Sequence, residues 1–393
     1  MRVRSKSSPT LLEIRFQGGV PFSTASEHRQ ALSLVRRLIR GSGVAFAGLA
    51  PGAAMLESLT GGRSAAHVFK LTPLFGPDSQ VRGPPVIVKI APRAQGTTEK
   101  ANYEKFVRWG LPAACRPELH GFARTRDLSG LCYAFVGGDG GARVDTLTDH
   151  LQRGDTTKLE LVLRRIFDSM RDTWYSPHLL RQERDIARRY LDRYFSGERE
   201  TFATETALRG CAERYFGARQ SDGRCVIGST SFPALRALLF ASKRKRAYHS
   251  CILHRDLNTD NIVVAHDPDC VTLIDFQKTG RGHVYEDLVA LEASVRINFP
   301  PAASFSEILE TERLIALARQ QPRTDRYAVS IRKIRHAAFS YFGRLEDEAN
   351  YQFAVAAVGL RLMQAIDLPE FARARITAGA LWAAKALTGE LSA

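Results

Sequence analysis

The stretch HRDLNTDNIVV, followed by VTLIDFQ, constrains the fold of this chain more than any other segment. Asp256 and Asn261 stand on a polar loop before one apolar run, and Asp275 stands at the end of the next. Two short apolar runs that turn on DPDC predict a hairpin. The start of one strand and the end of the next lie together in a hairpin, so we expect these three side chains to converge.

Converging carboxylate and amide oxygens suit a particular chemistry. Mg²⁺ prefers oxygen ligands and usually takes only one or two of them from a protein. Phosphoryl transfer also needs a carboxylate that receives the proton of the acceptor hydroxyl or orients it. The loop and the hairpin therefore predict a site for metal-bound phosphates. The alternative is a polar loop on which these residues meet by accident.

The first part of the chain supplies two further features that a phosphate site needs. Gly61 and Gly62 lie in the turn TGGRSAA between the predicted strands AMLESL and HVFKLTPLF, and glycine lets backbone N–H groups approach an anion closely. Lys89 is the one charged residue of the predicted strand VIVKIA, and its long stem can cross apolar surface. The simpler alternatives are an ordinary hairpin turn and a lysine on an edge strand.

A lysine on an apolar strand needs an anionic partner when it is buried. The segment TTEKANYEKFVRWG predicts a helix with Thr97 or Thr98 as its cap and Gly110 as its end. Glu99 and Glu104 on this helix are the candidate partners, and their spacing leaves both open. Glu99 could also pair with a lysine on the helix surface.

Strands dominate the chain up to about residue 138, and helical periods dominate beyond it. A short amphipathic helix in SEHRQALSLVRRLIRG precedes the strands, and the glycine-rich GGDGG follows them. We expect an α+β protein with an N-terminal extension (1–50), a small β-rich lobe (51–138) and a large helical lobe (139–393). Helices are expected after residue 284 and, before it, over 145–153, 157–173, 180–195 and 231–246.

The chain has a formal net charge of +15, which attracts anions such as nucleotides. Aromatic residues do not interleave with basic ones, so a nucleic-acid partner is not expected. The basic run at 243–246 predicts a solvated helix end. No apolar run reaches membrane-spanning length. Six scattered cysteines, without a C-x-x-C pair, argue against zinc and for a reducing, cytoplasmic location.

The pattern H-R-D-L-x-x-x-N followed by IDF resembles the catalytic and metal-binding motifs of the protein-kinase-like superfamily. The order of glycine turn, strand lysine, helix glutamate, joint, loop and metal aspartate matches as well, over about residues 55–290. The segments GGRSAAHVF, EKANYEKF and LIDFQKTGRGHVYEDLVALEASVR look similar to bacterial ternary-complex-associated proteins of the aminoglycoside phosphotransferase and choline kinase branch. The resemblance implies a bilobal kinase-like fold, with a small antiparallel β-rich N-lobe and a large mainly helical C-lobe.

The resemblance implies roles for the polar residues in the second half of the chain. Within a catalytic loop at 252–261, Asp256 would be the catalytic base. Asn261 would hold Mg²⁺ together with Asp275, which belongs to a metal-binding segment at 273–277. The implied cofactors are therefore ATP and Mg²⁺.

The resemblance also implies a nucleotide site in the first half of the chain. Gly61, Gly62 and Ser64 belong to the turn that would cover the nucleotide phosphates. Lys89 would contact the phosphates, and Glu99 would steady the lysine. The nucleotide and a small-molecule acceptor are the implied partners, and a protein partner is left open.

Two residues would support the loop, and two others depart from the protein-kinase pattern. His254 would brace the loop, and Asp287 would either brace it or cap the following helix. Asn258 stands where protein kinases have a lysine, and Gln277 replaces the glycine of D-F-G. No A-P-E follows, so a small-molecule acceptor is favoured over a protein substrate.

Two functions from different classes therefore follow from the sequence. The first is an ATP- and Mg²⁺-dependent kinase that phosphorylates a hydroxyl or amine of a small molecule. The second is a regulatory module that binds a nucleotide with little or no catalysis. Phosphate transfer from ATP to a panel of acceptors distinguishes the two.

Overall fold

The computed structural model describes residues 12–19, 21–41, 51–59, 66–75, 81–136, 145–240, 246–264, 270–317, 325–365 and 367–390. The candidate turn residues Gly61, Gly62 and Ser64 lie outside these ranges, as does the glycine-rich segment 137–141. The chain divides into two compact units, Met1–Val144 with Thr272–Lys278, and Asp145–Val271 with Thr279–Ala393.

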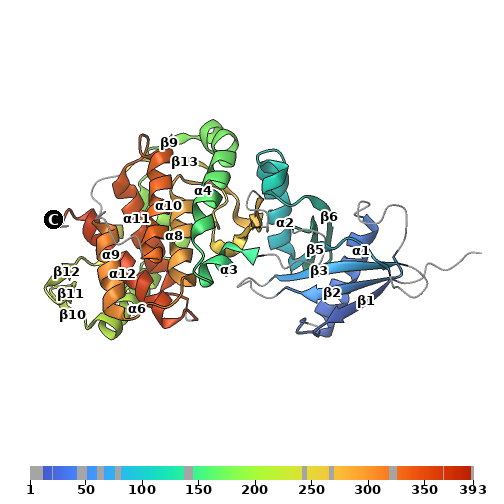
Figure 1. The fold of residues 1–393 in the computed structure, drawn as a ribbon, viewed down its shortest axis with the longest axis horizontal. Coiled ribbons are helices and arrows are strands. Elements are labelled where there is room, and N and C mark those ends of the chain that lie inside the picture. Colours follow the sequence, from blue (N-terminus) through green and yellow to red (C-terminus); the bar gives the residue numbers. More distant parts are fainter. Residues whose placement is uncertain are drawn as a thin grey trace, which may run out of the picture. The chain divides into compact units, whose positions relative to one another are not determined.

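The described strands of the first unit form a seven-stranded sheet in the order β1-β2-β3-β5-β7-β6, with β4 beside β3 (Figure 1). β1 runs parallel to β2, and the other neighbours are antiparallel. The elements of this unit are β1 (Glu13–Gln17), α1 (Ala25–Gly41), β2 (Ala53–Ser58), β3 (His67–Phe75), β4 (Val81–Arg82), β5 (Val86–Pro92), α2 (Arg93–Asn102), the π-helical turn η1 (Tyr103–Val107), the 3₁₀ turn η2 (Ala113–Cys115), β6 (Leu119–Arg124), β7 (Leu128–Ala134) and the 3₁₀ turn η6 (Phe276–Lys278).

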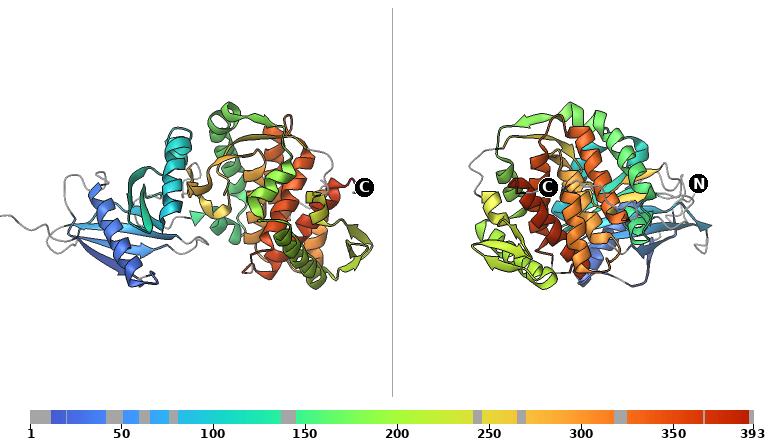
Figure 2. Two further views of the ribbon diagram at one scale, coloured as in Figure 1. Left: turned by 180° about the vertical axis from the view of Figure 1, so that it is seen from behind. Right: turned by 60° about the vertical axis from the view of Figure 1, so that its left-hand side comes forward.

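Helices α1 and α2 cover opposite faces of this sheet. A Cβ atom on Gly130 of β7 would lie 2.9 Å from Leu38 Cδ1 of α1. A Cβ atom on Gly96 of α2 would lie 2.1 Å from Ser129 Oγ of β7. Neighbouring residues of a strand point to opposite faces, so each helix approaches β7 closely from its own side, and a glycine permits each approach. Figure 2 shows α1, in blue, across the strands.

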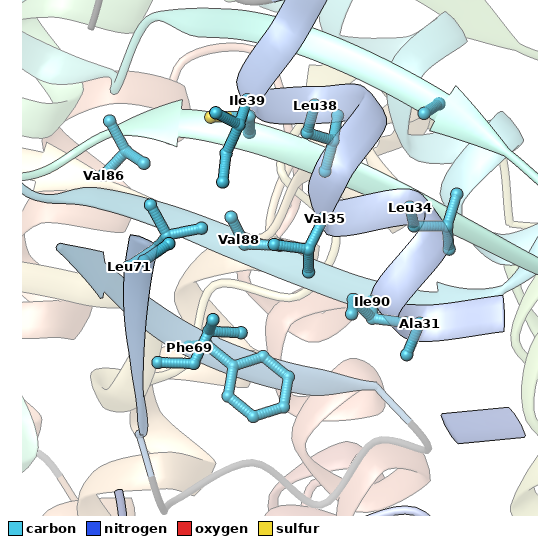
Figure 3. Packing of buried hydrophobic residues seen from close by; sticks show 14 of the residues in the cluster. Ala31, Leu34, Val35, Leu38, Ile39, Phe69, Leu71, Val86, Val88 and Ile90 are labelled. Carbon is cyan, nitrogen blue, oxygen red and sulfur yellow. The ribbon is translucent and has the colours of Figure 1, made fainter. Parts of the chain in front are cut away.

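The amphipathic helix α1 forms much of the hydrophobic core of the first unit, because its apolar residues recur every three or four positions. Figure 3 shows the helix residues Ala31, Leu34, Val35, Leu38 and Ile39 packed toward the strand residues Phe69, Leu71, Val86, Val88 and Ile90. The helix at the start of the chain is therefore part of the core and not an appendage to it.

Helix α2 begins earlier than the sequence predicted. Thr97 and Thr98 were expected to cap it, but the helix begins at Arg93, directly after Pro92. The two threonine hydroxyls donate to the carbonyl oxygens of Arg93 (2.7 Å) and Ala94 (3.0 Å). A threonine inside a helix makes this bond to the preceding turn, so its presence alone does not mark a helix start.

The second unit is mainly helical, which together with the β-rich first unit confirms the predicted α+β class. Among the described residues, no helix is both long enough and apolar enough to cross a membrane. The longer helices, in green to red, are seen in Figure 2. They are α3 (Leu147–Gln152), α4 (Thr157–Met170), α5 (Ile186–Tyr194), α6 (Glu198–Phe216), α7 (Leu235–Phe240), α8 (Glu286–Asn298), α9 (Phe305–Ala316), α10 (Arg326–Phe342), α11 (Glu348–Leu362) and α12 (Glu370–Leu387).

Short strands interrupt the helices of the second unit. β16 (Gly280–His283), β13 (Tyr248–Leu253) and β9 (Leu180–Gln182) form one sheet, and β8 (Asp145–Thr146) pairs with β14 (Ile262–Val264). The strand β15 (Val271–Leu273) spans the boundary between the two units. A further sheet consists of β10 (Arg219–Ser221), β11 (Arg224–Ile227) and β12 (Thr230–Phe232).

Three parts of the second unit differ from the sequence prediction. A strand occupies the start of the helix expected at 180–195, and another occupies the start of the helix expected at 231–246. Helix α6 was not predicted. Its buried face includes Thr201, Thr204 and Glu205, so the apolar period that would identify a helix is weak there.

Replacing a core residue of α1 tests whether this helix stabilises the first unit. Leu34 is completely buried, so Leu34→Ala should lower the free energy of unfolding by about 2–5 kcal/mol. Urea unfolding followed by circular dichroism measures the change. Ser33→Ala, at an exposed position of the same helix, is the control and should change it by less than about 0.5 kcal/mol. Similar effects of the two substitutions would contradict the packing described above.

Candidate functional site

Strand register directs Lys89 toward α2. Lys89 of β5 lies opposite Leu131 of β7, and directly opposite residues share one face of a sheet. Leu131 is on the α2 side, because its Cδ1 atom lies 3.2 Å from the Cβ position of Gly96. Lys89 is only 7% exposed, so its ammonium group must find partners inside the unit.

The ammonium group of Lys89 is held between two carboxylates. Its Nζ atom lies 2.8 Å from Glu99 Oε2 and 2.8 Å from Asp275 Oδ1. Tyr133 donates a hydrogen bond of 2.9 Å to the other oxygen of Glu99. Burial alone would lower the pKa of Lys89, but the two carboxylates outweigh it and raise the pKa. The Lys89 triad, defined as Lys89, Glu99 and Asp275, therefore contains a fixed cation.

The choice between the two glutamates, which the sequence left open, falls on Glu99. Glu104 instead binds Lys100 at 2.7 Å on the more exposed side of the helix. A helix advances 100° per residue, so positions five apart point in clearly different directions. Glu99 is 1% exposed and faces the sheet.

A short turn after Asp275 is anchored to α2. Asp275 has a φ of +65°, a left-handed conformation that aspartate tolerates better than most residues. The turn η6 follows directly, and Asn102 Nδ2 donates to the carbonyl oxygens of Gln277 (2.7 Å) and Phe276 (3.4 Å). Phe276 is fully buried. Gln277, which the sequence comparison singled out as a departure from the D-F-G pattern, contributes a backbone anchor, and sequence reasoning missed its partner Asn102.

In the second unit, Asp287 holds the loop that follows β13. Its carboxylate accepts hydrogen bonds from the backbone N–H groups of His254 (2.8 Å) and Arg255 (2.6 Å). Arg255 has a φ of +64°, so the loop turns sharply at the residue that Asp287 holds. The residue before α8 is Tyr285, and Asp287 lies in the first turn of the helix. The sequence left two roles open for Asp287, a brace for the loop and a cap for the following helix. Its hydrogen bonds fit the first role.

The environment of Asp287 is unusual for an aspartate. The side chain is fully buried, and this burial raises the pKa of Asp287 from 3.8 to about 7 against the opposing effect of the two N–H donors. A carboxyl group with this pKa changes its protonation state within the range of ordinary buffers.

The loop itself places Asp256 beside Asn261. Asn261 Nδ2 donates to the carbonyl oxygen of Asp256 at 2.9 Å. Asn258 Oδ1 accepts hydrogen bonds from the N–H groups of Asp260 (3.0 Å) and Asn261 (3.1 Å), and so caps the 3₁₀ turn η5 (Thr259–Asn261). Asn258 therefore shapes the loop. Because the amide nitrogen of Asn261 is engaged, its amide oxygen is the atom that could bind a metal.

A cluster of buried hydroxyl groups also fixes this loop, through Thr259. Thr259 Oγ1 lies 2.8 Å from Ser294 Oγ and 2.6 Å from Thr148 Oγ1, and Asn298 Nδ2 donates to it at 2.8 Å. These partners are 35 to 111 residues away in the chain, so sequence reasoning missed them. The available signal was a pair of polar residues, Ser294 and Asn298, four apart on the otherwise buried helix α8.

Arginine residues also contact the loop. Glu286 is 1% exposed and binds Arg193 (2.7 Å), Arg189 (3.1 Å) and Arg255 (3.4 Å). Arg193 also donates to the carbonyl oxygen of Arg255 at 2.7 Å. Both the side chain and the backbone of Arg255 are therefore held, which stabilises its left-handed conformation.

The predicted site residues thus fall into two described groups. The first unit brings together Lys89, Glu99 and Asp275, and the second brings together His254, Asp256, Asn261 and Asp287. In the parts of the chain that are described, no group of three or more His, Cys, Asp or Glu side chains could hold a metal ion. A metal ion shared by Asn261 and Asp275 stays a prediction.

One family model matches most of the chain. The family model described as ternary complex associated domain 9 matches residues 52–205 and 204–340, which is more than half of the chain. No curated protein matches the sequence.

Three similar solved structures are distant in sequence. An aminoglycoside phosphotransferase from Streptomyces rimosus is 15% identical with a TM-score of 0.40, and the match covers 84% of this chain and 97% of that one. Its complex with ADP and streptomycin is 16% identical with a TM-score of 0.39 and the same coverage. A Plasmodium vivax ethanolamine kinase is 11% identical with a TM-score of 0.39, and 89% of each chain is covered.

The burial of Asp287 predicts a pH dependence of stability. Between its unfolded pKa of 3.8 and its folded pKa of about 7, the folded protein binds a proton that the unfolded chain has released. The contribution of Asp287 to stability therefore falls as the pH rises through this window and is constant above it.

Asp287→Asn removes the titrating group and replaces one of the two oxygens that accept hydrogen bonds from the backbone N–H groups of His254 and Arg255. We expect the variant to be less stable than the parent by about 1–3 kcal/mol at about pH 4.5, and the difference to shrink toward about pH 8. Urea unfolding at a series of pH values measures both free energies. A difference that grows with rising pH would show that Asp287 is buried as a charged group.

Proposed function

The chain belongs to the ternary complex associated domain 9 family, and we propose that it is an ATP- and Mg²⁺-dependent phosphotransferase. It transfers the γ-phosphate of ATP to a hydroxyl or amine of a small molecule. Nucleotide binding is assigned to an N-lobe at 51–138, and the acceptor to a helical C-lobe at 139–393. The observation that carries the proposal is the Lys89 triad.

Lysines on apolar surfaces usually extend the ammonium group to solvent. Lys89 instead stays buried between two carboxylates, and only well-formed pairing offsets the cost of removing these charges from water. Clusters of buried charge with a partly exposed member are typical of functional sites, and the Asp275 side chain is 27% exposed. In our proposal Lys89 orients the α- and β-phosphates, and Glu99 holds it in position.

The residues assigned to the metal fit Mg²⁺. Asp275 offers a carboxylate. Asn261 offers its amide oxygen, and its amide nitrogen is hydrogen-bonded to the backbone carbonyl oxygen of Asp256. Mg²⁺ takes oxygen ligands and usually only one or two from protein. When bound, it would neutralise charge on the phosphate oxygens. The turn η6, bonded to Asn102, would keep Asp275 in place.

Asp256 is assigned as the general base that accepts the proton of the acceptor group. Its loop is fixed at several points, by Asp287, by Asn258 and through Thr259 by the buried hydroxyl cluster. Such fixation matters because a base must be held within hydrogen-bond reach of the proton that it removes. His254, whose backbone Asp287 holds, serves this positioning.

The base assignment is tested by a pair of substitutions in one loop. Asp256→Asn should lower turnover by about 10²–10⁴-fold, the usual contribution of a general base, and leave ATP affinity nearly unchanged. Asp260→Asn changes an exposed carboxylate four residues away and should leave turnover at the parental rate. Phosphate transfer from labelled ATP to a panel of alcohols and amines measures the rates. Parental turnover in Asp256→Asn would disprove the assignment.

A substitution of Lys89, on β5, tests the assignment of this residue to nucleotide binding. Lys89→Met should weaken ATP binding by about 10- to 100-fold, the value of one charge-assisted contact. Lys100→Met removes the same charge from the surface of α2 and should leave ATP affinity within about twofold. Titration of a fluorescent ATP analogue measures affinity, and circular dichroism checks folding. Nucleotide binding without transfer to any acceptor would favour the regulatory module over the enzyme.

A further inference from the structure

The positive charge of the chain is concentrated in its first unit. The described residues of that unit include 16 lysines and arginines and 8 aspartates and glutamates, a formal net charge of +8. The corresponding numbers for the described residues of the second unit are 30 and 29, so the charges there nearly balance. An excess of positive charge on one unit attracts anionic partners to that unit.

The basic run at 243–246 does not account for this difference. Residues 243–245 lie outside the described ranges, and Arg246 belongs to the second unit. The sequence predicted a solvated helix end here, but Arg246 lies in the segment before β13 and not in a helix.

Much of the charge of the first unit lies on the outer face of α1, opposite the side that packs on the sheet. A helix advances 100° per residue, so four polar residues lie within about 60° of one another around its axis. They are Arg29, Ser33, Arg36 and Arg40. Arg36 is half-buried and the other three are exposed. Arg29 and Arg40 are eleven residues apart, so the row is about 16 Å long.

The turn between β6 and β7 extends this row to one side. Arg37 Nη1 of α1 donates to the carbonyl oxygen of Arg124 at 2.7 Å, and Arg93 Nη1 donates to the carbonyl oxygen of Arg126 at 3.4 Å. The side chain of Arg126 is 92% exposed. We call these seven residues the arginine face: Arg29, Arg36, Arg37, Arg40, Arg93, Arg124 and Arg126.

The arginine face is poor in neutralising carboxylates. Among the described residues, one ion pair involves the face, between Arg126 Nε and Asp127 Oδ1 at 3.9 Å. Arg37 and Arg93 are held by backbone carbonyl oxygens, which fix a guanidinium group without cancelling its charge. In the described parts of α1 and of the turn, no large apolar side chain is exposed. The face is therefore polar, cationic and partly fixed in position.

We propose that the arginine face binds the phosphate backbone of double-stranded DNA. A guanidinium group matches a phosphate through two parallel N–H donors, and a serine such as Ser33 also donates to phosphate oxygens. Duplex DNA carries one negative charge per about 1.7 Å of its axis, so a row of about 16 Å lies alongside roughly ten phosphates. The major groove of B-DNA, about 12 Å wide, admits an α-helix, whereas that of double-stranded RNA is too narrow.

The composition of the face disfavours other anionic partners. Stable protein interfaces have a core enriched in aromatic residues and depleted of charge, and stable membrane association requires an inserted apolar group besides basic residues. Single-stranded nucleic acids stack their bases on aromatic rings, and the lack of interleaved aromatic residues argues against them. That argument does not extend to a duplex, because its bases are already stacked on one another.

Binding of a labelled 20-base-pair duplex to the full chain, followed by fluorescence anisotropy at a series of KCl concentrations, tests the proposal. The logarithm of the affinity should fall linearly with the logarithm of the salt concentration, with a slope between about −3 and −6, because each neutralised phosphate contributes about −0.9. A slope near zero would overturn the proposal, and so would the lack of binding at about 50 mM KCl and 50 μM protein.

Two sets of substitutions locate the duplex. Combined Arg29→Gln, Arg37→Gln and Arg40→Gln should weaken binding at least about tenfold at about 50 mM KCl and reduce the size of the slope by about 2–3. Combined Arg124→Gln and Arg126→Gln, in the neighbouring turn, should reduce the slope by about 1–2. Parental affinity and slope in both variants would refute the proposal.

A matched control removes the same net charge from the second unit. Arg164, Arg188 and Arg199 are exposed arginines of α4, α5 and α6, and their combined replacement by glutamine should leave DNA affinity within about threefold of the parent, because salt screens charges that do not contact the duplex. Equal weakening by this control and by the triple substitution in α1 would show that binding follows net charge and not the arginine face.

Competition identifies the partner. Unlabelled duplex DNA should displace the probe at a lower charge concentration than double-stranded RNA, single-stranded DNA, polyglutamate or phosphatidylserine vesicles. Stronger competition by any of these would assign the face to that partner and disprove the DNA proposal. Affinity for a fluorescent ATP analogue should stay within about twofold in the α1 and turn variants, because these arginines lie outside the assigned phosphotransfer residues. Failure of the ATP assignments therefore leaves this test intact.

Discussion

The buried ammonium group of Lys89 needs anionic partners, and much of the first unit can be understood as the means of supplying them. Strand register turns Lys89 toward α2, and Gly96 lets α2 approach the sheet closely enough to bring Glu99 within 2.8 Å. Asp275 itself has a left-handed backbone conformation, and the turn that follows it is hydrogen-bonded to Asn102. Its carboxylate lies at the same distance from the ammonium group. Loss of Lys89 would leave the Glu99 carboxylate buried without an opposite charge, which typically costs about 3–5 kcal/mol.

The amino-acid sequence predicts those features of the fold that depend on neighbours in the chain. The predicted strand HVFKLTPLF corresponds to β3, and the apolar run around Lys89 corresponds to β5. The start of α2 was predicted wrongly, because a threonine inside a helix resembles a helix cap in the sequence. Helix α6 was not predicted, because its buried face includes threonine and glutamate and so does not show the regular spacing of apolar residues that identifies a helix. Strand β1 was also missed, since it is defined by its pairing with β2, which comes after α1 in the chain. Strand β6 was missed as well, although its partner β7 is the next strand along the chain.

The same distinction applies to the candidate site. Spacing along the loop identified Asp256 and Asn261, and the hydrogen bond between them is local. Asn102 and Thr148 support the site through contacts that span more than 100 residues, and no short motif encodes such contacts. Glu99 could be chosen over Glu104 only after the helix had a defined rotation relative to the sheet. The shared metal ion between Asn261 and Asp275 is still a prediction from sequence.

Helix α1 has a consequence for how the domain is delimited. The family match begins at residue 52, but α1 ends at Gly41 and packs its apolar side on one face of the sheet. A chain cut at the family boundary would expose that face to water, with Leu71, Val88 and Ile90 uncovered and prone to association. The folded unit is therefore longer than the segment that matches the family. A fragment for expression should begin before β1, so that it includes α1.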